Sequence, residues 1–449
     1  MKGSERNTRQ VLVAGLWSCR APRTRSRRVF VGWGWMRERF RISLNLFVVA
    51  LAAVWRRLSL GPQVIAITGS VGKTTAKKCL AAMLSSHFPI TVSGSVNGGA
   101  RFELPRTLLR TRRRHRFVIA EVGILKPGIM WRSAWLLKPD IAVILGVRWQ
   151  HSVNFQSLDH IAAEKAKLLG GLRRGGLAVL NGEDPRVAAM ANPARFRVSL
   201  FGTSPGSELW ATDVAASWPG RLEFQVHTTD ATLKVETRLV GRHWVPSVLA
   251  ALAVARQCGV SLEDSIRALR NLEPHPARLE PCRLPSGATM LRDEYNGAMD
   301  TLLRALTVLE EASGVTRRVV VVGNTSDAAQ TGPELARRVG REIARVSEMA
   351  VFIGEYAETS ARAAVDAGMD PRHTHSLRFA EEAPLLLQRE LQAGDLVLLR
   401  GMFSDHLSRI YFAQLGTVAC WKKVCAKMTL CDDCPELGTV QQAAQRPHV

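Results

Sequence analysis

Aromatic side chains, cysteines and long apolar runs are all scarce in this sequence. Only 8 of the 449 residues are cysteines, which excludes a small disulfide-stapled scaffold and suggests a reducing compartment. The best candidate for a membrane span is the fourteen-residue apolar run Ile42–Trp55. A membrane-spanning helix needs roughly 20 apolar residues, so no segment is predicted to cross a bilayer. The length and the 46% hydrophobic content instead allow two or three domains, each with its own core.

Acidic residues are also few, so the chain is strongly basic. It carries 61 Lys and Arg against 39 Asp and Glu, a net charge of +22, and residues 1–60 supply half of the excess. Such charge attracts nucleic acids or anionic membranes. Aromatic side chains on which a base could stack are sparse around the arginine run over residues 110–116. We interpret this run as a solvated loop, with an anionic substrate or membrane as the alternative, and expect no nucleic-acid partner.

The sequence changes character near residue 62, where an α/β pattern begins. Residues 1–35 are rich in arginine, serine and glycine, and we predict them to be disordered, with a true start at Met1 or Met36. Short apolar runs then alternate with helix-like segments, which is typical of a parallel sheet. The predicted strands are Val64–Thr68, Val118–Val122, Ile141–Val147 and Leu177–Leu180, and the helices include Thr75–Leu84 and Leu158–Leu169.

The second half of the sequence predicts an antiparallel ribbon, two helices, a linker and a second α/β series. Polar and apolar residues alternate in the ribbon segments Arg221–Val226 and Thr232–Val240. Helix patterns follow at Val245–Cys258 and Leu262–Asn271, and the proline-rich stretch Pro274–Pro285 is interpreted as a linker. The later strands are predicted at Thr289–Arg292, Arg318–Gly323, Met349–Ile353 and Asp395–Leu399. We expect domains at 62–281 and 282–416, preceded by a basic segment at 1–61 and followed by a cysteine-rich tail at 417–449.

The strongest local signal is a phosphate-binding loop within Val64–Thr75. A buried strand leads into a turn that contains Gly69 and Gly72 and then into a helix, so backbone N–H groups and the helix N-terminus can face an anion. Lys73 can reach the outer phosphates, and the hydroxyl of Thr74 can bind Mg²⁺. The first glycine of the general pattern is missing, so the loop is a shortened variant.

Several motifs in a fixed order make the chain similar to the Mur ligases, which build the peptide of peptidoglycan. The motifs are residues 68–75, Glu121-Val122-Gly123, His151, Ala163–Lys167, Asn181–Pro185, Gly241–His243, Arg278–Glu280 and Asp293–Asn296. The subgroup that adds D-alanyl-D-alanine to a UDP-muramoyl tripeptide is the most similar. The resemblance implies a P-loop ATP domain followed by a Rossmann-like domain. It also implies an ATP-dependent ligase that joins a carboxylate to an amine through an acyl phosphate.

The resemblance also assigns roles to individual residues. It implies that Lys73, Glu121, His151 and Lys165 are catalytic, Lys165 as a carbamate formed with CO₂. It implies that Mg²⁺ is bound by Thr74, Glu121, His151 and Lys165. ATP is expected to contact Gly69, Ser70, Val71, Gly72, Lys73, Thr74, Thr75, Arg278, Asp293 and Asn296.

The departures from the family pattern fall on the substrate side. They are Gly146, Trp244, Asn296–Met299, Asn324 and Arg400–Met402. Only about sixty residues precede the phosphate loop, too few for the family's UDP-sugar domain, so a UDP-muramoyl substrate is not supported directly. The alternatives are a ligase for a capsule-type polymer, similar to poly-γ-glutamate synthases, and a non-catalytic ATP-binding partner subunit.

Two features lie outside the resemblance. Cys420, Cys425, Cys431 and Cys434 fall within fifteen residues, a pattern that indicates zinc or an iron–sulfur cluster, with a redox disulfide or unliganded thiols as alternatives. The apolar run Ile42–Trp55 is flanked by Arg39, Arg41, Arg56 and Arg57. Residues 36–60 therefore predict either an interfacial helix at an anionic membrane or a helix packed on the ATP domain. We expect a cytoplasmic protein, with the inner membrane face as a further contact.

Overall fold

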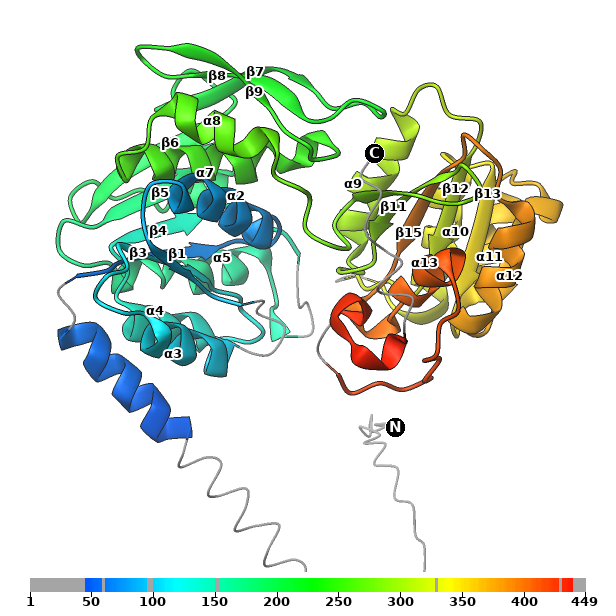
Figure 1. The fold of residues 1–449 in the computed structure, drawn as a ribbon, viewed down its shortest axis with the longest axis horizontal. Coiled ribbons are helices and arrows are strands. Elements are labelled where there is room, and N and C mark those ends of the chain that lie inside the picture. The colour runs from blue at the N-terminus through cyan, green and yellow to red at the C-terminus, as the bar shows by residue number, and fades with distance from the viewer. Residues whose placement is uncertain are drawn as a thin grey trace, which may run out of the picture. The chain divides into compact units, whose positions relative to one another are not determined.

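The computed structural model describes residues 45–58, 61–94, 100–149, 154–327, 330–427 and 430–438. These residues form two sheets with helices on both faces (Figure 1). The first sheet has nine strands in the order β2-β3-β1-β4-β5-β6-β7-β8-β9. They are β1 (Gln63–Thr68), β2 (Ile90–Val92), β3 (Phe117–Glu121), β4 (Ile141–Ile144), β5 (Leu177–Asn181), β6 (Arg197–Gly202), β7 (Leu209–Ala215), β8 (Glu223–His227) and β9 (Thr232–Glu236). The four strands predicted in this region are confirmed.

The first sheet is parallel from β2 to β7 and antiparallel at β8 and β9. β1 lies between β3 and β4, and every residue of β3, β4 and β5 is buried. Strands buried on both faces read as continuous apolar runs, as expected for parallel sheets. The predicted ribbon is also confirmed, because β8 pairs antiparallel with both β7 and β9.

Helices cover the first sheet on both faces and create a core on each side (Figure 1). One face is packed by α2 (Lys73–Ser85), α7 (Val245–Gln257) and α8 (Leu262–Arg270). The other is packed by α3 (Ala100–Arg110), α4 (Ile129–Leu137), α5 (Leu158–Ala166) and α6 (Pro185–Ala188). The phosphate-binding loop connects the central strand β1 to α2, so it emerges at the carboxyl edge of the sheet.

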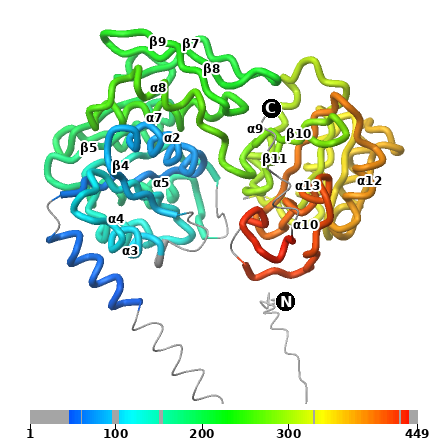
Figure 2. Tube along the Cα trace, viewed as in Figure 1, coloured from blue at the N-terminus to red at the C-terminus, as the bar shows by residue number. Residues whose placement is uncertain are grey.

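The second sheet has six strands in the order β10-β11-β15-β12-β13-β14. Figure 2 traces the chain through this domain, with β10 and β11 labelled. They are β10 (Glu280–Arg283), β11 (Thr289–Asp293), β12 (Arg318–Val322), β13 (Met349–Ile353), β14 (Thr374–Leu377) and β15 (Leu396–Arg400). The helices are α9 (Met299–Glu310), α10 (Gly332–Ala344), α11 (Ala357–Asp366), α12 (Ala383–Glu390) and α13 (Ser408–Leu415). The linker interpretation of Pro274–Pro285 is wrong in part, since β10 lies inside it and pairs antiparallel with β11.

A helix over residues 45–58 precedes the first sheet, and from residue 49 onward it packs on that domain. Ala52 and Ala53 are buried in the core that also contains α3 and α4. The expectation that Arg56 faces lipid headgroups is wrong, because this side chain is 1% exposed. Its guanidinium donates to the carbonyls of Leu137 and Lys138, both at 2.8 Å, and to Asp140 at 2.7 Å.

The described residues include no helix long and apolar enough to span a bilayer. The cysteine-rich tail forms two short 3₁₀ turns, η8 (Cys431–Asp433) and η9 (Pro435–Leu437), which pack against α13 and the second sheet. Residues 1–44, including the segment predicted to be disordered, lie outside the part of the chain that the structure describes.

Candidate functional site

The phosphate-binding loop is held by backbone geometry that only glycine tolerates. Gly72 forms the N-cap of α2 at φ 86°, a left-handed conformation that side chains disfavour. A Cβ at Gly69 would approach that of Leu145 to 2.8 Å, closer than real Cβ contacts. The hydroxyl of Ser247, in α7, donates to the Gly72 carbonyl at 3.2 Å and ties the loop to the neighbouring helix. The loop is therefore preformed for close approach of a phosphate.

Four charged or hydroxyl side chains meet directly beyond this loop. The Thr74 hydroxyl lies 3.1 Å from both carboxylate oxygens of Glu121, which ends β3. Lys77 forms an ion pair with Glu121 at 2.9 Å, and Arg278 donates to the Thr74 hydroxyl at 3.1 Å. Although burial alone would raise the pKa of Glu121, Lys77, Lys73 and Arg278 lower it, so this carboxyl is ionised. An ionised carboxylate beside a hydroxyl is an oxygen donor set suited to Mg²⁺.

Lys73 folds back onto the phosphate loop. Its ammonium donates to the Gly69 carbonyl at 2.8 Å and lies 3.4 Å from that of Ser70. Burial lowers the pKa of Lys73 to about 8, opposed by Glu121 and reinforced by Arg278. An anion that replaces these carbonyls would raise the pKa of Lys73 again and keep the ammonium charged. The side chain is therefore placed to bind a phosphate.

Lys165 is fully buried in α5, and its amino group makes no hydrogen bond within the described part of the chain. Burial lowers the pKa of Lys165 well below the usual lysine value, and the charge of Lys73 adds to this shift. The preceding residue, Glu164, accepts from the backbone N–H groups of Gly128 and Met130 and so holds α5 against the start of α4. Burial therefore favours the neutral amine form of Lys165, and the contacts of Glu164 hold its helix in place. His151 lies outside the described residues.

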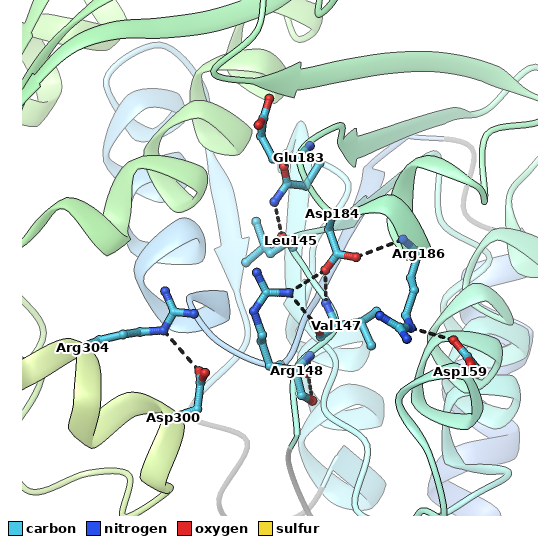
Figure 3. A network of polar contacts seen from close by, with 11 residues as sticks. Leu145, Val147, Arg148, Asp159, Glu183, Asp184, Arg186, Asp300 and Arg304 are labelled. Carbon is cyan, nitrogen blue, oxygen red and sulfur yellow. Dashed lines mark hydrogen bonds and ion pairs between the residues drawn. The ribbon is translucent and has the colours of Figure 1, made fainter. Parts of the chain in front are cut away.

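The segment that follows β4 is clamped onto the phosphate loop (Figure 3). Asp184 accepts from the backbone N–H of Val147 at 2.7 Å and from Arg148 at 3.0 Å. The hydroxyl of Ser70 in turn accepts from the backbone N–H of Arg148 at 2.9 Å. Asn181 donates to the Leu145 carbonyl at 2.8 Å. The motif Asn181–Pro185 therefore holds the segment after β4 in place, and that segment contacts the phosphate loop. Asp300 and Arg304 of α9 form a separate ion pair.

A second group of predicted residues lines a small pocket at the carboxyl end of β11. The pocket is lined by Val71, His243, Trp244, Arg278, Leu279, Asp293, Tyr295, Asn296, Thr301, Arg304 and Arg400. Arg278 lies over the Tyr295 ring at 4.2 Å and joins this pocket to the Thr74–Glu121 cluster. The structure thus brings Arg278, Asp293 and Asn296 together beside the phosphate loop.

Two departures from the family pattern occupy this pocket. Arg400 is buried and forms an ion pair with Asp293, and it also donates to the Ala298 carbonyl at 3.2 Å. Burial raises the pKa of Asp293, which Arg400 opposes. Trp244 is also buried, with its ring 4.5 Å from that of His243 and its indole N–H without a hydrogen bond among the described residues. The indole of Trp244 and the guanidinium of Arg400 therefore form part of the pocket wall.

The four tail cysteines line one enclosed pocket, apart from the phosphate loop. Its walls are His406, Arg409, Cys420, Cys425, Lys427, Cys431, Cys434, Glu436 and Leu437. Cys431 Sγ lies 3.6 Å from His406 Nδ1, and none of the seven described cysteines is in a disulfide. Among the described residues, no three His, Cys, Asp or Glu side chains already enclose a metal position.

Sequence reasoning missed three residues of these sites. Lys77 lies one helical turn after Lys73, and this spacing puts both lysines on one face of α2. The spacing could have indicated that Lys77 also belongs to the site. Arg400 ends β15 beside β11, which is visible only from strand order. His406 lies far from the cysteines in sequence, so no spacing rule pointed to it.

Comparison with known proteins agrees with this geometry. Residues 67–255 match the Mur ligase middle domain, and residues 277–403 match the Mur ligase, glutamate ligase domain. The UDP-N-acetylmuramoyl-tripeptide–D-alanyl-D-alanine ligase of Mycobacterium tuberculosis is 31% identical over 394 residues, covering 83% of this chain and 76% of the relative. The corresponding ligase of Escherichia coli is 30% identical over 286 residues, covering 63% of this chain and 61% of the relative.

Solved structures show the same fold. MurF from Acinetobacter baumannii superimposes with a TM-score of 0.72 at 24% identity, covering 82% of this chain and 79% of that one. MurF from Thermotoga maritima, solved in complex with ADP, gives 0.68 at 18% identity over 82% and 83% of the two chains. The fold prediction and the family resemblance are confirmed, and the capsule-type and non-catalytic alternatives are not favoured. The chain belongs to the Mur ligase family and is an ATP-dependent amide-bond ligase of the MurF type.

Proposed function

We propose that this ligase joins D-alanyl-D-alanine to a peptide carboxylate, the activity that the names of its relatives state for them. The observation that carries the proposal is the cluster of Lys73, Lys77, Thr74, Glu121 and Arg278 around a preformed phosphate loop. A carboxylate oxygen attacks the γ-phosphorus of ATP and ADP leaves. The dipeptide nitrogen then attacks the acyl carbon, loses a proton and expels phosphate.

Residues on both sides of the nucleotide divide the work. Lys73 leaves the Gly69 carbonyl and neutralises charge on the transferring phosphoryl group, which is electrostatic stabilisation by a preplaced cation. Arg278 bridges the phosphate side and the pocket at Asp293, where His243, Trp244 and Tyr295 supply flat surfaces for the adenine ring. Because Lys77 is bonded to the carbonyls of Ser93 and Gly94 as well as to Glu121, it keeps that carboxylate aimed at the loop.

The oxygen donors at this site fit Mg²⁺. Glu121 and Thr74 would hold the ion, which supplies Lewis-acid polarisation of the phosphate oxygens. Lys165 would add a carbamate oxygen, because a buried neutral amine can attack CO₂ and become an anion, and its orphaned amino group has no other partner among the described residues. His151 stays a predicted ligand. We place this reaction in the cytoplasm, where ATP is available.

The proposal is tested by mass analysis of the ligated product. Purified protein with ATP, Mg²⁺, a muramoyl or free tripeptide and D-alanyl-D-alanine should yield a product that lacks one water relative to its two substrates. L-alanyl-L-alanine should be a much poorer amine, and Lys126→Ala, an exposed lysine after β3, serves as the matched control for lysine substitutions at the site. ATP consumption without an amide product, under any of these combinations, would overturn the substrate assignment.

A second proposal concerns the outer face of the helix from residue 49 onward. Leu51, Val54 and Leu58 are 46%, 52% and 76% exposed and recur at the spacing of one helix face. Trp131 and Trp135, one turn apart in α4, are 59% and 45% exposed, and Arg57 lies over the Trp135 ring at 4.3 Å. Exposed leucines beside tryptophans and arginines are typical of peripheral contact with an anionic membrane. We therefore infer that this face touches a membrane surface.

Sedimentation with vesicles tests this contact. The protein should bind vesicles rich in anionic lipid and be released by salt, and Leu58→Glu with Trp131→Ser should abolish binding while ligase activity persists. Truncation is a poor test, because Ala52, Ala53 and Arg56 belong to the domain core. Equal recovery of the parent and the double variant with vesicles would contradict the proposal.

A further inference from the structure

The pocket in the C-terminal tail gathers more metal-binding chemistry than the cysteine spacing alone indicated. His406 reaches it from the turn after η7 (Phe403–Asp405), 25 positions before Cys431 in the sequence. This histidine is 6% exposed and adopts a left-handed backbone conformation at φ 53°, which is unfavourable for a residue with a side chain. Its Nε2 atom makes no hydrogen bond among the described residues. His406 is thus a buried imidazole in a strained backbone conformation, with one ring nitrogen that makes no hydrogen bond among the described residues. Together with the four thiols of the pocket, it indicates a ligand-binding site.

The one measured pair has the separation that a shared ion imposes. Two ligands of a tetrahedral zinc, with Zn–S about 2.3 Å and Zn–N about 2.0 Å, stand about 3.5 Å apart. Cys431 Sγ and His406 Nδ1 are 3.6 Å apart. Cys434 follows Cys431 across a tight turn, closed by the hydrogen bond from the Cys434 N–H to the Cys431 carbonyl at 3.1 Å. The backbone carbonyl of Cys425 lies beside the His406 ring.

The surrounding charges suit thiolates. Lys427 donates to the sulfur of Cys434 at 3.3 Å, and Arg409 lines the same pocket beside Cys431. Three thiolates and one imidazole around a divalent ion carry a net charge of about −1, which two nearby cations offset. Glu436, the acidic residue of the pocket wall, is paired with Lys422 at 2.9 Å and Lys427 at 3.1 Å.

We propose that this pocket holds one structural zinc ion, with Cys425, Cys431, Cys434 and His406 as its ligands. Since no three of these groups already enclose a metal position, the cysteine side chains must turn about their Cα–Cβ bonds to close on the ion. Cys420 also lines the pocket, but Cys425 is assigned as the ligand because its backbone carbonyl lies beside the His406 ring. The site closes a loop that runs from the end of β15 to the tail and has no part in the chemistry at the phosphate loop.

The ion would also fix a charge network in the second domain. Asp432 lies between two of the ligands and binds Arg292 of β11 through both oxygens, at 2.8 and 2.9 Å. Arg292 is fully buried and also pairs with Glu294 at 2.6 Å and Glu280 at 3.4 Å. Loss of the ion would free the turn that carries Asp432, and Arg292 would lose a partner. The zinc site therefore stabilises the fold of the second domain.

The full-length protein, prepared without chelators, provides the test. Elemental analysis should find about one zinc per chain. Cys431→Ser, Cys434→Ser and His406→Ala should lose the ion, whereas Cys420→Ser and the control Cys258→Ser should keep it. The zinc-free protein should melt several degrees lower. Loss of zinc from Cys420→Ser with retention in His406→Ala would overturn the assigned ligands.

Cobalt exchange in the parent protein keeps the proposal testable where a variant fails to fold. Cobalt(II) in place of zinc should give the visible bands of a tetrahedral site and near-ultraviolet absorption from three thiolates. Thiol titration of the native protein should show three cysteines protected until a chelator is added. Iron with a visible absorbance, or a folded metal-free protein with all tail thiols reactive, would refute the zinc site.

Discussion

The phosphate-loop site and the cysteine pocket both contain buried nitrogens without a hydrogen bond among the described residues, among them Lys165 Nζ in the first and His406 Nε2 in the second. Their surroundings differ. The first site is built from oxygen donors and cations on rigid elements, with Glu121 already held by Lys77 and Thr74. The second is built from sulfur on short turns. Hard donors beside preformed cations suit a magnesium nucleotide, whereas soft donors on pliable backbone suit a metal that completes the fold. The donor atoms that surround each site thus indicate which metal it would bind.

The largest effect is expected from Lys73→Ala. The substitution should lower phosphate release by roughly 1000-fold, because a preplaced cation at the transferring phosphoryl group is lost. Zinc content and thermal stability should not change, which separates the two regions. Steady-state phosphate release, with Lys126→Ala as the exposed control, measures this. Turnover equal to that of the parent would remove Lys73 from the mechanism.

Lys165→Ala should lower turnover by about 100-fold, because the carbamate oxygen that Lys165 would supply to Mg²⁺ is lost. Lys165→Arg should fail equally, because a charged guanidinium cannot react with CO₂. The parent should lose activity when bicarbonate and dissolved CO₂ are removed and regain it when they return. If bicarbonate has no effect and Lys165→Arg is active, the orphaned amine has another role.

Proton uptake on ATP binding tests whether Lys73 binds the phosphate anion. The pKa of Lys73 is lowered to about 8 without ligand, chiefly by burial, and a bound phosphate raises it again. Below about pH 8 the lysine is already charged, and above it each ATP must bring a proton with it, so affinity falls as pH rises. Calorimetry at about pH 9 in two buffers of different ionisation enthalpy should report nearly one proton taken up. Lys73→Ala should take up none.

The smallest effects on the two sites are expected from substitutions at Arg56, a buried cation that is already paired with Asp140. Arg56→Met should lower the free energy of unfolding by about 3 kcal/mol, because Asp140 and two carbonyls lose their donor. Arg57→Met, which removes only the stacking on Trp135, should cost about 0.5–1 kcal/mol. Denaturant titration measures both. Neither substitution should change zinc content or turnover, in contrast to residues at the orphaned nitrogens.

Much of the fold and of the nucleotide site could be predicted, because both depend on residues that are close together in the sequence. The buried strands β1, β3, β4 and β5 are continuous apolar runs, and the glycines and Lys73 follow β1 directly. The strand β10 was not predicted, because the four prolines of Pro274–Pro285 favoured a linker and the strand forms only by pairing with β11. Arg400 and His406 were missed because their partners, Asp293 and Cys431, are 107 and 25 positions away. Such residues are revealed only once the sheet order is known.

Whether Arg56 faces lipid or protein also lay beyond sequence. An apolar helix flanked by arginines is compatible with both environments. Which of them an arginine faces depends on whether the folded domain places a carboxylate such as Asp140 within reach of it. Here one face of the helix packs in the domain core, as one of the two interpretations predicted, and the other face is exposed.

The most direct test of the account is the fate of oxygen in the acceptor carboxylate. With that carboxylate labelled by ¹⁸O and with ATP, Mg²⁺ and D-alanyl-D-alanine, the released phosphate should carry one ¹⁸O, because the carboxylate oxygen bonds to phosphorus and leaves with it. Mass analysis of the phosphate measures this. Amide formation with unlabelled phosphate would contradict the acyl-phosphate mechanism that the phosphate loop, Lys73 and Glu121 are proposed to serve.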